Sequence, residues 1–362
     1  MEPLMNEVEA RAARDAAIDA FVRQYANGPD ADLMQSMIKT ICRLARDGAE
    51  RGDVKILDSA LKELRYAFKI FGPYHQVRKV TIFGSARTPE THPEYIQAAR
   101  FGERMARENW MTITGAGDGI MKAGHGGAGR EASFGVAIRL PFEQATNDII
   151  ADDPKLVTFK YFFTRKLMFI KEASAVALFP GGFGTQDEGF EALTLVQTGK
   201  APMLPIVLID APGGTYWQHW RTYVTAELLR TGMISPEDTS LFFVTDNVED
   251  AARHILRFYN VYHSSRYVRD RLVIRLNRPL PDAILDEANR DYGDMLSSGR
   301  IEAVATADEE SDDFPELPRI GMYFNRRSHG RLRRMIDRFN NLESGAAAGG
   351  APAAAAHSAR AF

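Results

Sequence analysis

The feature of this chain that most constrains its fold is a series of short apolar runs, rich in β-branched residues, that alternate with stretches of helical periodicity. Six such runs follow one another along the middle of the chain: KVTIFG, WMTITG, FGVAIRL, SAVALFP, MLPIVLID and SLFFVTD. This alternation is typical of βαβ units, in which parallel strands are buried between helices on both faces of a sheet. The sequence therefore predicts an α/β fold, a doubly wound Rossmann-like parallel sheet, over residues 76–260.

Residues 1–75 predict a helical N-terminal extension. Apolar side chains recur there at intervals of three and four residues, and no run resembles a strand. The clearest series is Val54, Leu57, Leu61, Leu64 and Phe68.

The C-terminal part has a different pattern. Residues 261–343 predict a small α+β appendage in the order β-α-β-β-α, with RLVIRL, IEAVA and RIGMYF as its strands. The acidic stretch 308–313 predicts a solvated loop, and residues 344–362, rich in Ala and Gly, predict a disordered tail.

Charge and cysteine content limit the classes of partner. The formal net charge is −3, so no overall field draws the chain to nucleic acid or to an anionic membrane, and a small-molecule substrate is expected instead. Cys42 is the only cysteine, which excludes an internal disulfide and a multi-cysteine metal site. No apolar run approaches the ~20 residues of a membrane helix, and the N-terminus lacks a signal-peptide pattern. We therefore expect a cytoplasmic protein.

The strongest local signal is PGGFGTQDE, residues 180–188, which directly follows the apolar run SAVALF and precedes a helical stretch. A glycine-rich turn at the carboxyl end of a parallel strand lets backbone amides approach an anion, and the N-terminus of the next helix adds a partial positive charge. The segment predicts a phosphate site formed by Gly181, Gly182, Phe183, Gly184 and Thr185.

The same residues allow a purely structural interpretation. Thr185 as an N-cap and Glu188 three residues later would form a capping box, and the glycines would then only make the turn tight. This motif alone does not decide between the two interpretations, so its neighbours have to.

A basic pair precedes the same strand. The stretch FFTRKLMF, residues 162–169, has the pattern of a helix with Arg165 and Lys166 near its start. A guanidinium there could reach the strand ends and clamp phosphate or ribose oxygens bidentately. The alternative, a solvated pair on a helix surface, is the commoner fate of an Arg-Lys dipeptide.

A second glycine-rich turn, TGAGDGIM, follows another strand and contains Gly115 and Gly117. It resembles half of a dinucleotide fingerprint. However, Ile120 stands where the third glycine belongs, and Arg139 stands where an NAD enzyme needs an acidic residue. NAD is therefore disfavoured, and an NADP-dependent oxidoreductase remains an alternative.

A third turn, GSAR, follows the first strand and gives Ser85 and Arg87 access to the same region, although an ordinary strand-to-helix connection would have the same sequence. All three turns come at the carboxyl ends of predicted parallel strands. They should converge at one edge of the sheet, where open α/β sheets bind their ligands.

Together these motifs resemble the Lonely Guy (LOG) family. PGGFGTQDE is similar to the family's PGGxGTxxE motif and TRKLMF to its RKxxM element, while TGAGDGIM and LPFEQATN are similar to its TGGGPGIM and LPxEQxxN stretches. The similarity extends over about residues 79–255. Proteins of this family were long labelled lysine decarboxylases, but act as phosphoribohydrolases on cytokinin nucleotides, AMP or related monophosphates.

The resemblance implies that this chain hydrolyses the N-glycosidic bond of a nucleoside 5′-monophosphate to free base and ribose 5-phosphate. It also implies a homodimer or a larger homo-oligomer and no cofactor. No lysine with a partner for a pyridinium ring stands out, so the chemistry of a pyridoxal phosphate decarboxylase is not expected.

The resemblance also implies roles for individual residues. The catalytic pair would be Arg165 and Glu188. The 5′-phosphate would be held by Gly182, Gly184 and Thr185. Further contacts to the nucleotide would come from Asn147, Lys166 and Thr194. Ala116 and Asp118 depart from the family's TGGGPG pattern, so the resemblance says less about that loop.

Cleavage of an N-glycosidic bond develops positive charge at the anomeric carbon, which a carboxylate stabilises. We expect Glu188 to supply it, and to be ionised because the helix dipole favours negative charge in the first turn. Arg165 would fix the ribose or phosphate. A nucleotide-binding sensor or carrier that uses the same crevice without turnover is the alternative, since a fold and a phosphate loop do not prove catalysis.

Overall fold

The computed structural model describes residues 7–26, 28–140, 146–307 and 314–342. The predicted acidic loop and C-terminal tail lie outside these ranges. By its contacts the chain divides into two compact units, Met1–Lys62 and Glu63–Phe362.

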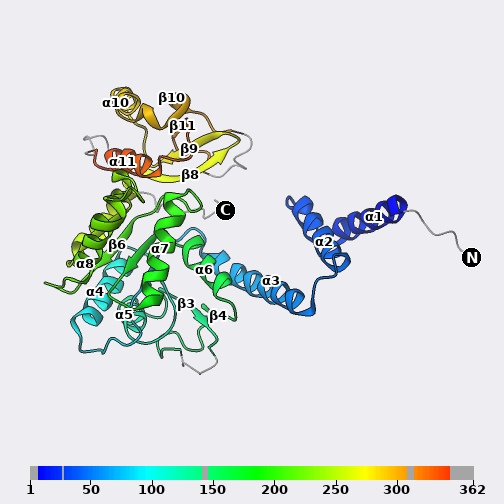
Figure 1. The fold of residues 1–362 in the computed structure, drawn as a ribbon, viewed down its shortest axis with the longest axis horizontal. Helices are drawn as coiled ribbons and strands as arrows, with labels where there is room; N and C mark the ends of the chain where they lie inside the picture. Colours follow the sequence, from blue (N-terminus) through cyan, green and yellow to red (C-terminus); the bar gives the residue numbers. More distant parts are fainter. Residues whose placement is uncertain (1–6, 27, 141–145, 308–313, 343–362) are drawn as a thin grey trace, which may run out of the picture. The chain divides into compact units, whose positions relative to one another are not determined.

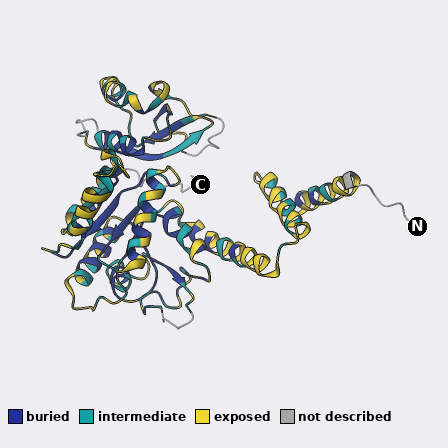
Figure 2. Ribbon diagram, in the orientation of Figure 1, coloured by how far each residue is buried: buried dark blue, intermediate teal, exposed yellow. Residues whose placement is uncertain are grey.

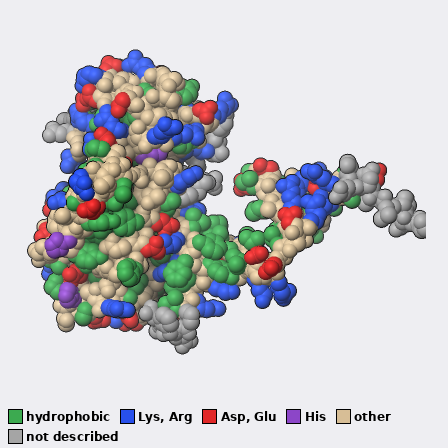
Figure 3. Space-filling view, viewed as in Figure 1, with side chains coloured by type: hydrophobic (Ala, Val, Ile, Leu, Met, Phe, Trp, Pro, Cys, Tyr) green, Lys and Arg blue, Asp and Glu red, His purple; other side chains and the backbone are tan. Residues whose placement is uncertain are grey.

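The first unit is helical, as predicted. It contains α1 (Glu7–Tyr25), α2 (Ala31–Arg46) and the beginning of α3 (Arg51–Phe71). The spacing of apolar residues gives α2 and α3 strongly amphipathic surfaces, yet no described residue of α2 is buried. Hydrophobic side chains are therefore visible on the surface of this unit (Figure 3).

The second unit is built on the predicted parallel sheet, which has seven strands in the order β4-β3-β2-β1-β5-β6-β7 (Figure 1). All neighbouring pairs are parallel. The strands are β1 (Lys79–Phe83), β2 (Met111–Thr114), β3 (Ser133–Ile138), β4 (Leu156–Phe159), β5 (Ala175–Leu178), β6 (Ile206–Ile209) and β7 (Phe242–Thr245). The α/β Rossmann-like fold class is confirmed. The edge strand β4 was not among the six predicted runs.

Helices cover both faces of this sheet. They are α4 (Pro93–Arg107), α5 (Ile120–Ala128), α6 (Phe162–Lys171), α7 (Phe183–Gln197), α8 (Tyr216–Tyr223) and α9 (Val248–Phe258). Because βαβ connections are right-handed and the chain moves in opposite directions from β1 to β2 and from β5 to β6, α4 and α7 lie on opposite faces. The strands between them are buried on both sides (Figure 2), which explains their continuous apolar runs.

The remaining segments of the second unit are four short helices and an antiparallel sheet of four strands, ordered β10-β11-β9-β8. The short helices are the 3-10 helices η1 (Gly72–Tyr74), η3 (Pro236–Leu241) and η4 (Gly293–Met295), and η2 (Val224–Leu229), a π-helical continuation of α8. The sheet and its helices comprise β8 (Tyr262–Val268), β9 (Arg271–Leu276), α10 (Asp282–Tyr292), β10 (Leu296–Val304), β11 (Arg319–Phe324) and α11 (His329–Asn340). The predicted β-α-β-β-α order lacked β8, whose sequence YHSSRYV has no apolar run.

Helix α11 attaches this antiparallel sheet to the parallel one. Arg333 is completely buried, donates two hydrogen bonds to Asp337 at 2.9 and 3.0 Å, and lies 3.1 Å from the Nε2 atom of His254 on α9. Asn340 accepts hydrogen bonds from the backbone amides of Val261 and Tyr262. Among the described residues, no helix combines the length and the apolar character needed to cross a bilayer.

The direction of strand order reverses between β1 and β5, where the chain goes from β1 outward to β2 on one side and from β5 outward to β6 on the other. A crevice forms at such a reversal because the connections leaving the two strands pass to opposite faces of the sheet. The candidate site lies there.

Candidate active site

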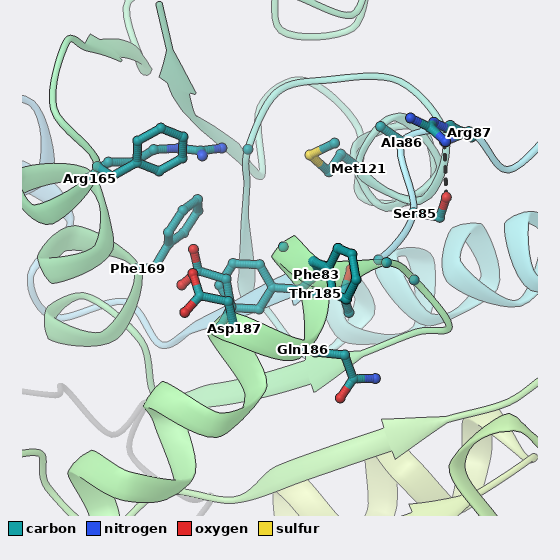
Figure 4. Close-up of a pocket in the computed structure, with 18 of the residues that line it drawn as sticks. Phe83, Ser85, Ala86, Arg87, Met121, Arg165, Phe169, Thr185, Gln186 and Asp187 are labelled. Atoms are coloured by element: carbon teal, nitrogen blue, oxygen red, sulfur yellow. Dashed lines mark hydrogen bonds between the residues drawn. The ribbon is translucent and has the colours of Figure 1, made fainter. Parts of the chain in front are cut away.

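A cavity of about 830 Å³ opens over the carboxyl ends of β1, β2 and β5. The three turns singled out in the sequence all contribute to it, as expected from the parallel sheet. In the view of Figure 4, Arg165 and Phe169 of α6 lie on one side, Ser85 and Arg87 on the other, and the start of α7 below. Its lining includes most of the predicted site residues: Ser85, Gly115, Arg165, Gly181, Gly182, Phe183, Gly184, Thr185 and Glu188.

The helix after the glycine-rich turn begins earlier than the capping-box interpretation requires. Helix α7 starts at Phe183, with Gly182 as its N-cap. The amides of Thr185 and Gln186 both donate to the Gly182 carbonyl at 3.1 Å. Thr185 is therefore inside the helix, and a capping box with Thr185 as N-cap is wrong. The first amides of a helix have no acceptor within the helix. In α7 these amides belong to Phe183 and Gly184, which line the cavity.

The glycines of this turn serve two different purposes. A Cβ at Gly181 would collide with the Thr185 side chain and crowd the Ser85 amide, so only glycine fits there. At Gly182 and Gly184 a Cβ would meet no atom within 4 Å. The open space beside these two residues lets an anionic group approach the backbone.

Tyr216 supports the turn from a neighbouring connection and was not found from the sequence. Its hydroxyl donates to the Gly181 carbonyl at 2.6 Å and accepts a hydrogen bond from Gln186 Nε2 at 2.6 Å. Tyr216 also lines the cavity. It lies 35 residues from Gly181 in sequence, at the start of α8, and only the fold brings the two together.

Arg165 is held by two neighbours at the cavity wall. Its Nε donates to the Val136 carbonyl of β3 at 2.8 Å, and its guanidinium lies 5.0 Å from the centre of the Phe169 ring. A Cβ at Gly115 would collide with this guanidinium, so the glycine leaves the space that Arg165 occupies. Burial lowers the pKa of Arg165 to about 10, and the nearby charge of Glu188 opposes this shift.

Glu188 is buried in the same cavity, with 7% of its surface exposed, and its Oε2 atom has no hydrogen-bond partner in the described protein. Burial raises its pKa to about 7, although the positive charges of Lys166 and Arg165 oppose this shift. The expectation that the helix dipole keeps this carboxyl ionised is therefore wrong. Glu188 lies in the second turn of α7, where the dipole has faded and desolvation dominates.

Four predicted contact residues lie outside the lining of this cavity: Lys166, Thr194, Asn147 and Gly117. Lys166 pairs with Asp187 at 2.8 Å and Glu191 at 2.6 Å. Thr194 is exposed further along α7. Their contacts to a nucleotide remain predictions.

Asn147 supports the second glycine turn from behind. It is buried. Its backbone amide donates to the Ala116 carbonyl, and its side-chain Nδ2 donates to the Gly117 carbonyl at 2.9 Å. Gly117 lines a smaller adjoining cavity of about 370 Å³, which Arg165 also borders. Among the described residues, no group of three or more His, Cys, Asp or Glu side chains is arranged to hold a metal ion.

Comparison with known proteins gives a family and a relative. The family model described as "possible lysine decarboxylase" matches residues 117–255. The cytokinin riboside 5′-monophosphate phosphoribohydrolase of Mycobacterium tuberculosis (strain ATCC 25618 / H37Rv) is 31% identical over 170 residues, which cover 45% of this chain and 86% of the relative.

Two solved structures are similar to about half of this chain, at lower identity. The Moco carrier protein from Chlamydomonas reinhardtii is 20% identical, with a TM-score of 0.35 over 50% of this chain and 98% of its own. The molybdenum cofactor binding protein from the phototrophic bacterium Rippkaea orientalis is 16% identical, with a TM-score of 0.35 over 49% of this chain and 93% of its own. Both similarities are too weak to indicate a shared activity.

The relative from Mycobacterium tuberculosis is matched over 86% of its length, and the residues that the family model matches, 117–255, include α6, the glycine-rich turn at 180–184 and α7. On this basis the chain belongs to the LOG family, whose members include cytokinin riboside 5′-monophosphate phosphoribohydrolase and whose family model carries the older description of a possible lysine decarboxylase.

Proposed function

We propose that this protein hydrolyses the N-glycosidic bond of nucleoside 5′-monophosphates, AMP or a cytokinin riboside monophosphate, and releases the free base and ribose 5-phosphate. The observation that carries the proposal is the buried Glu188 carboxyl, which faces the same cavity as the start of α7 and Arg165. The name of the mycobacterial relative supports the same reaction.

The phosphate would dock at the start of α7. The open backbone at Gly182 and Gly184 and the positive end of the helix favour an anion there. Arg165 adds a full positive charge to the lining of the same cavity. Phosphate binding takes place away from the reacting carbon, so its binding energy can orient the sugar toward Glu188.

Glu188 would act on the anomeric carbon and on the attacking water. In the reaction a water oxygen forms a bond to the anomeric carbon, the bond from that carbon to the base nitrogen breaks, and the base leaves with the bonding electron pair and takes up a proton. The carboxylate stabilises the positive charge that develops on the sugar and accepts the water proton. A pKa of about 7 leaves both forms of Glu188 populated at neutral pH, which suits a group that takes up and returns a proton.

The test is to incubate the protein with AMP or a cytokinin riboside monophosphate and to separate free base and ribose 5-phosphate by chromatography. Glu188→Gln and Arg165→Ala should each lose turnover by roughly a hundredfold or more while remaining folded. Asp250→Asn is the matched control, because the side chain of this acid on α9 is about half exposed and pairs with Arg253 on the same helix. Nucleotide binding without product in the wild-type protein would contradict the proposal and favour a sensor or carrier.

A further inference from the structure

The helix that carries Arg165 lacks a cap from its own sequence. Helix α6 begins after Tyr161, whose side chain makes no capping hydrogen bond. The first amides of any helix need acceptors from elsewhere. The Glu63 carboxylate on α3, almost 100 positions earlier, binds on either side of this N-cap: it accepts a hydrogen bond from the amide of Lys160, the residue before Tyr161, at 2.8 Å and from the Thr164 hydroxyl in the first turn at 2.6 Å.

Other contacts join the same part of α3 to the elements around Arg165. The ammonium of Lys171, at the end of α6, lies 5.1 Å from the centre of the Phe68 ring. The Phe71 ring stacks on Phe134 of β3, with centroids 4.3 Å apart. Two residues further along β3, the Val136 carbonyl accepts the hydrogen bond from Arg165. Helix α3 thus contacts both elements that hold the guanidinium.

The carboxylate of Glu63 suits this place for electrostatic reasons as well. Negative charge is favourable at the N-terminus of a helix, and a charged acceptor makes stronger hydrogen bonds than a neutral one. Thr164 is buried, and its hydroxyl has the Tyr161 carbonyl at 3.0 Å as a second acceptor. The hydrogen bond to Lys160, by contrast, is supplied by Glu63. Loss of the carboxylate would loosen the first turn of α6, where Arg165 directly follows Thr164.

We infer that Glu63 is a positioning residue: it fixes the start of α6 and thereby the place of the Arg165 guanidinium in the cavity. The inference rests on the proposed function, in which Arg165 binds the substrate. Glu63 precedes the segment that the family model matches, residues 117–255. The inference therefore gives Glu63 of helix α3 a part in the active site that acts through α6.

The experiment is a double-mutant cycle on the full chain with Glu63→Ala, Arg165→Ala and the combined variant. The readouts are kcat/KM for AMP and the dissociation constant of AMP from titration calorimetry, with folding checked by thermal unfolding. Glu63→Ala should lower kcat/KM by roughly tenfold to a hundredfold, because an error of about 1 Å in the placement of a binding group has an effect of this size. Glu63→Gln, which keeps one acceptor oxygen, should lie between the wild type and Glu63→Ala.

The combined variant decides whether Glu63 acts through Arg165. A positioning residue has no further effect once its target is removed, so the combined variant should match Arg165→Ala alone. A merely structural residue would add its own loss, and that result would overturn the inference. The control is Asp58→Ala, which removes an exposed acid from the same helix that pairs with Lys62 one turn away, and should leave both readouts unchanged.

The two readouts separate this inference from the proposed function. If the wild-type protein binds AMP but releases no base, the proposed function fails, and the same cycle measured on AMP affinity still decides the role of Glu63. If Glu63→Ala leaves AMP affinity and turnover at the wild-type level, the inference fails while the proposed function stands.

Discussion

Replacing Glu188 by glutamine should make the protein more stable at neutral and alkaline pH while removing its activity. Burial raises the pKa of this carboxyl from the ordinary 4.5 to about 7 in the folded chain. The folded state therefore holds the proton more tightly than the unfolded state, and the stability that comes from the neutral carboxyl is complete below about pH 4.5. It is lost as the pH rises through 7, because the buried group must then ionise without a hydrogen-bond partner for Oε2.

The size of the effect follows from the same pKa. A rise from 4.5 to about 7, at ~1.4 kcal/mol per pH unit, corresponds to a free energy of about 3 kcal/mol between acid and alkaline conditions. Glutamine resembles the protonated acid in shape and stays neutral at every pH. The variant and the wild type should therefore have similar stability near pH 4.5, and the variant should be more stable by up to about 3 kcal/mol at pH 8.

Urea unfolding of both proteins at half-unit steps from pH 4.5 to pH 8.5, at one protein concentration, measures this difference. Asp250→Asn is the control for removal of an exposed negative charge, and its difference from the wild type should stay nearly constant over this range. The reasoning is refuted if the Gln variant loses stability relative to the wild type as the pH rises. That result would mean that a partner in the folded protein favours the ionised carboxylate.

Three further predictions concern the cavity wall and its pH dependence. Gly115→Ala should lower AMP turnover by roughly tenfold or more with little loss of folding, because the new Cβ displaces the Arg165 guanidinium; steady-state kinetics beside a thermal melt checks this. Tyr216→Phe leaves the Gly181 carbonyl without this hydrogen bond and should weaken the binding of the phosphate. It should therefore raise KM for AMP and have a smaller effect on the turnover of unphosphorylated adenosine, with release of adenine as the measurement for both substrates. The value of kcat/KM should rise with pH and level off above about pH 7 if ionised Glu188 is the active form, and a fall across pH 6 to 8 would contradict that role.

The sequence predicts the parallel sheet and the place of the site because both depend on local patterns. Buried parallel strands need continuous apolar runs, and the turns at their carboxyl ends carry the glycines. The two strands that it misses, β4 and β8, lack a continuous buried run: β4 is an edge strand whose residues alternate between buried and more exposed, and β8 is polar in its middle and pairs with β9. Pairing with a neighbour, which no single segment encodes, makes them strands.

Three details of the site depend on tertiary contacts and could not be predicted. Thr185 looks like an N-cap in sequence, but the N-cap is Gly182, which has no side chain and contributes only its carbonyl, as acceptor for the Thr185 and Gln186 amides. Glu188 looks like a carboxylate stabilised by the helix dipole, but the packing around it desolvates the carboxyl more strongly than the dipole stabilises it. Tyr216 carries no motif, and its contact with Gly181 exists only because the connections after β5 and β6 meet at the same sheet edge.

The electrostatic state of the cavity is itself an argument for a ligand. Glu188 is buried there and Arg165 is half-buried, and desolvation shifts the pKa of each in the direction that favours its neutral form. No ion pair between them is found in the described part of the chain, although such a pair would relieve both groups. A folded protein keeps two unpaired ionisable groups in one cavity at a cost to its stability, and that cost is offset when a bound molecule supplies the missing charges. A nucleoside monophosphate carries the required combination, a phosphate for the guanidinium and a sugar carbon that becomes positive beside the carboxylate.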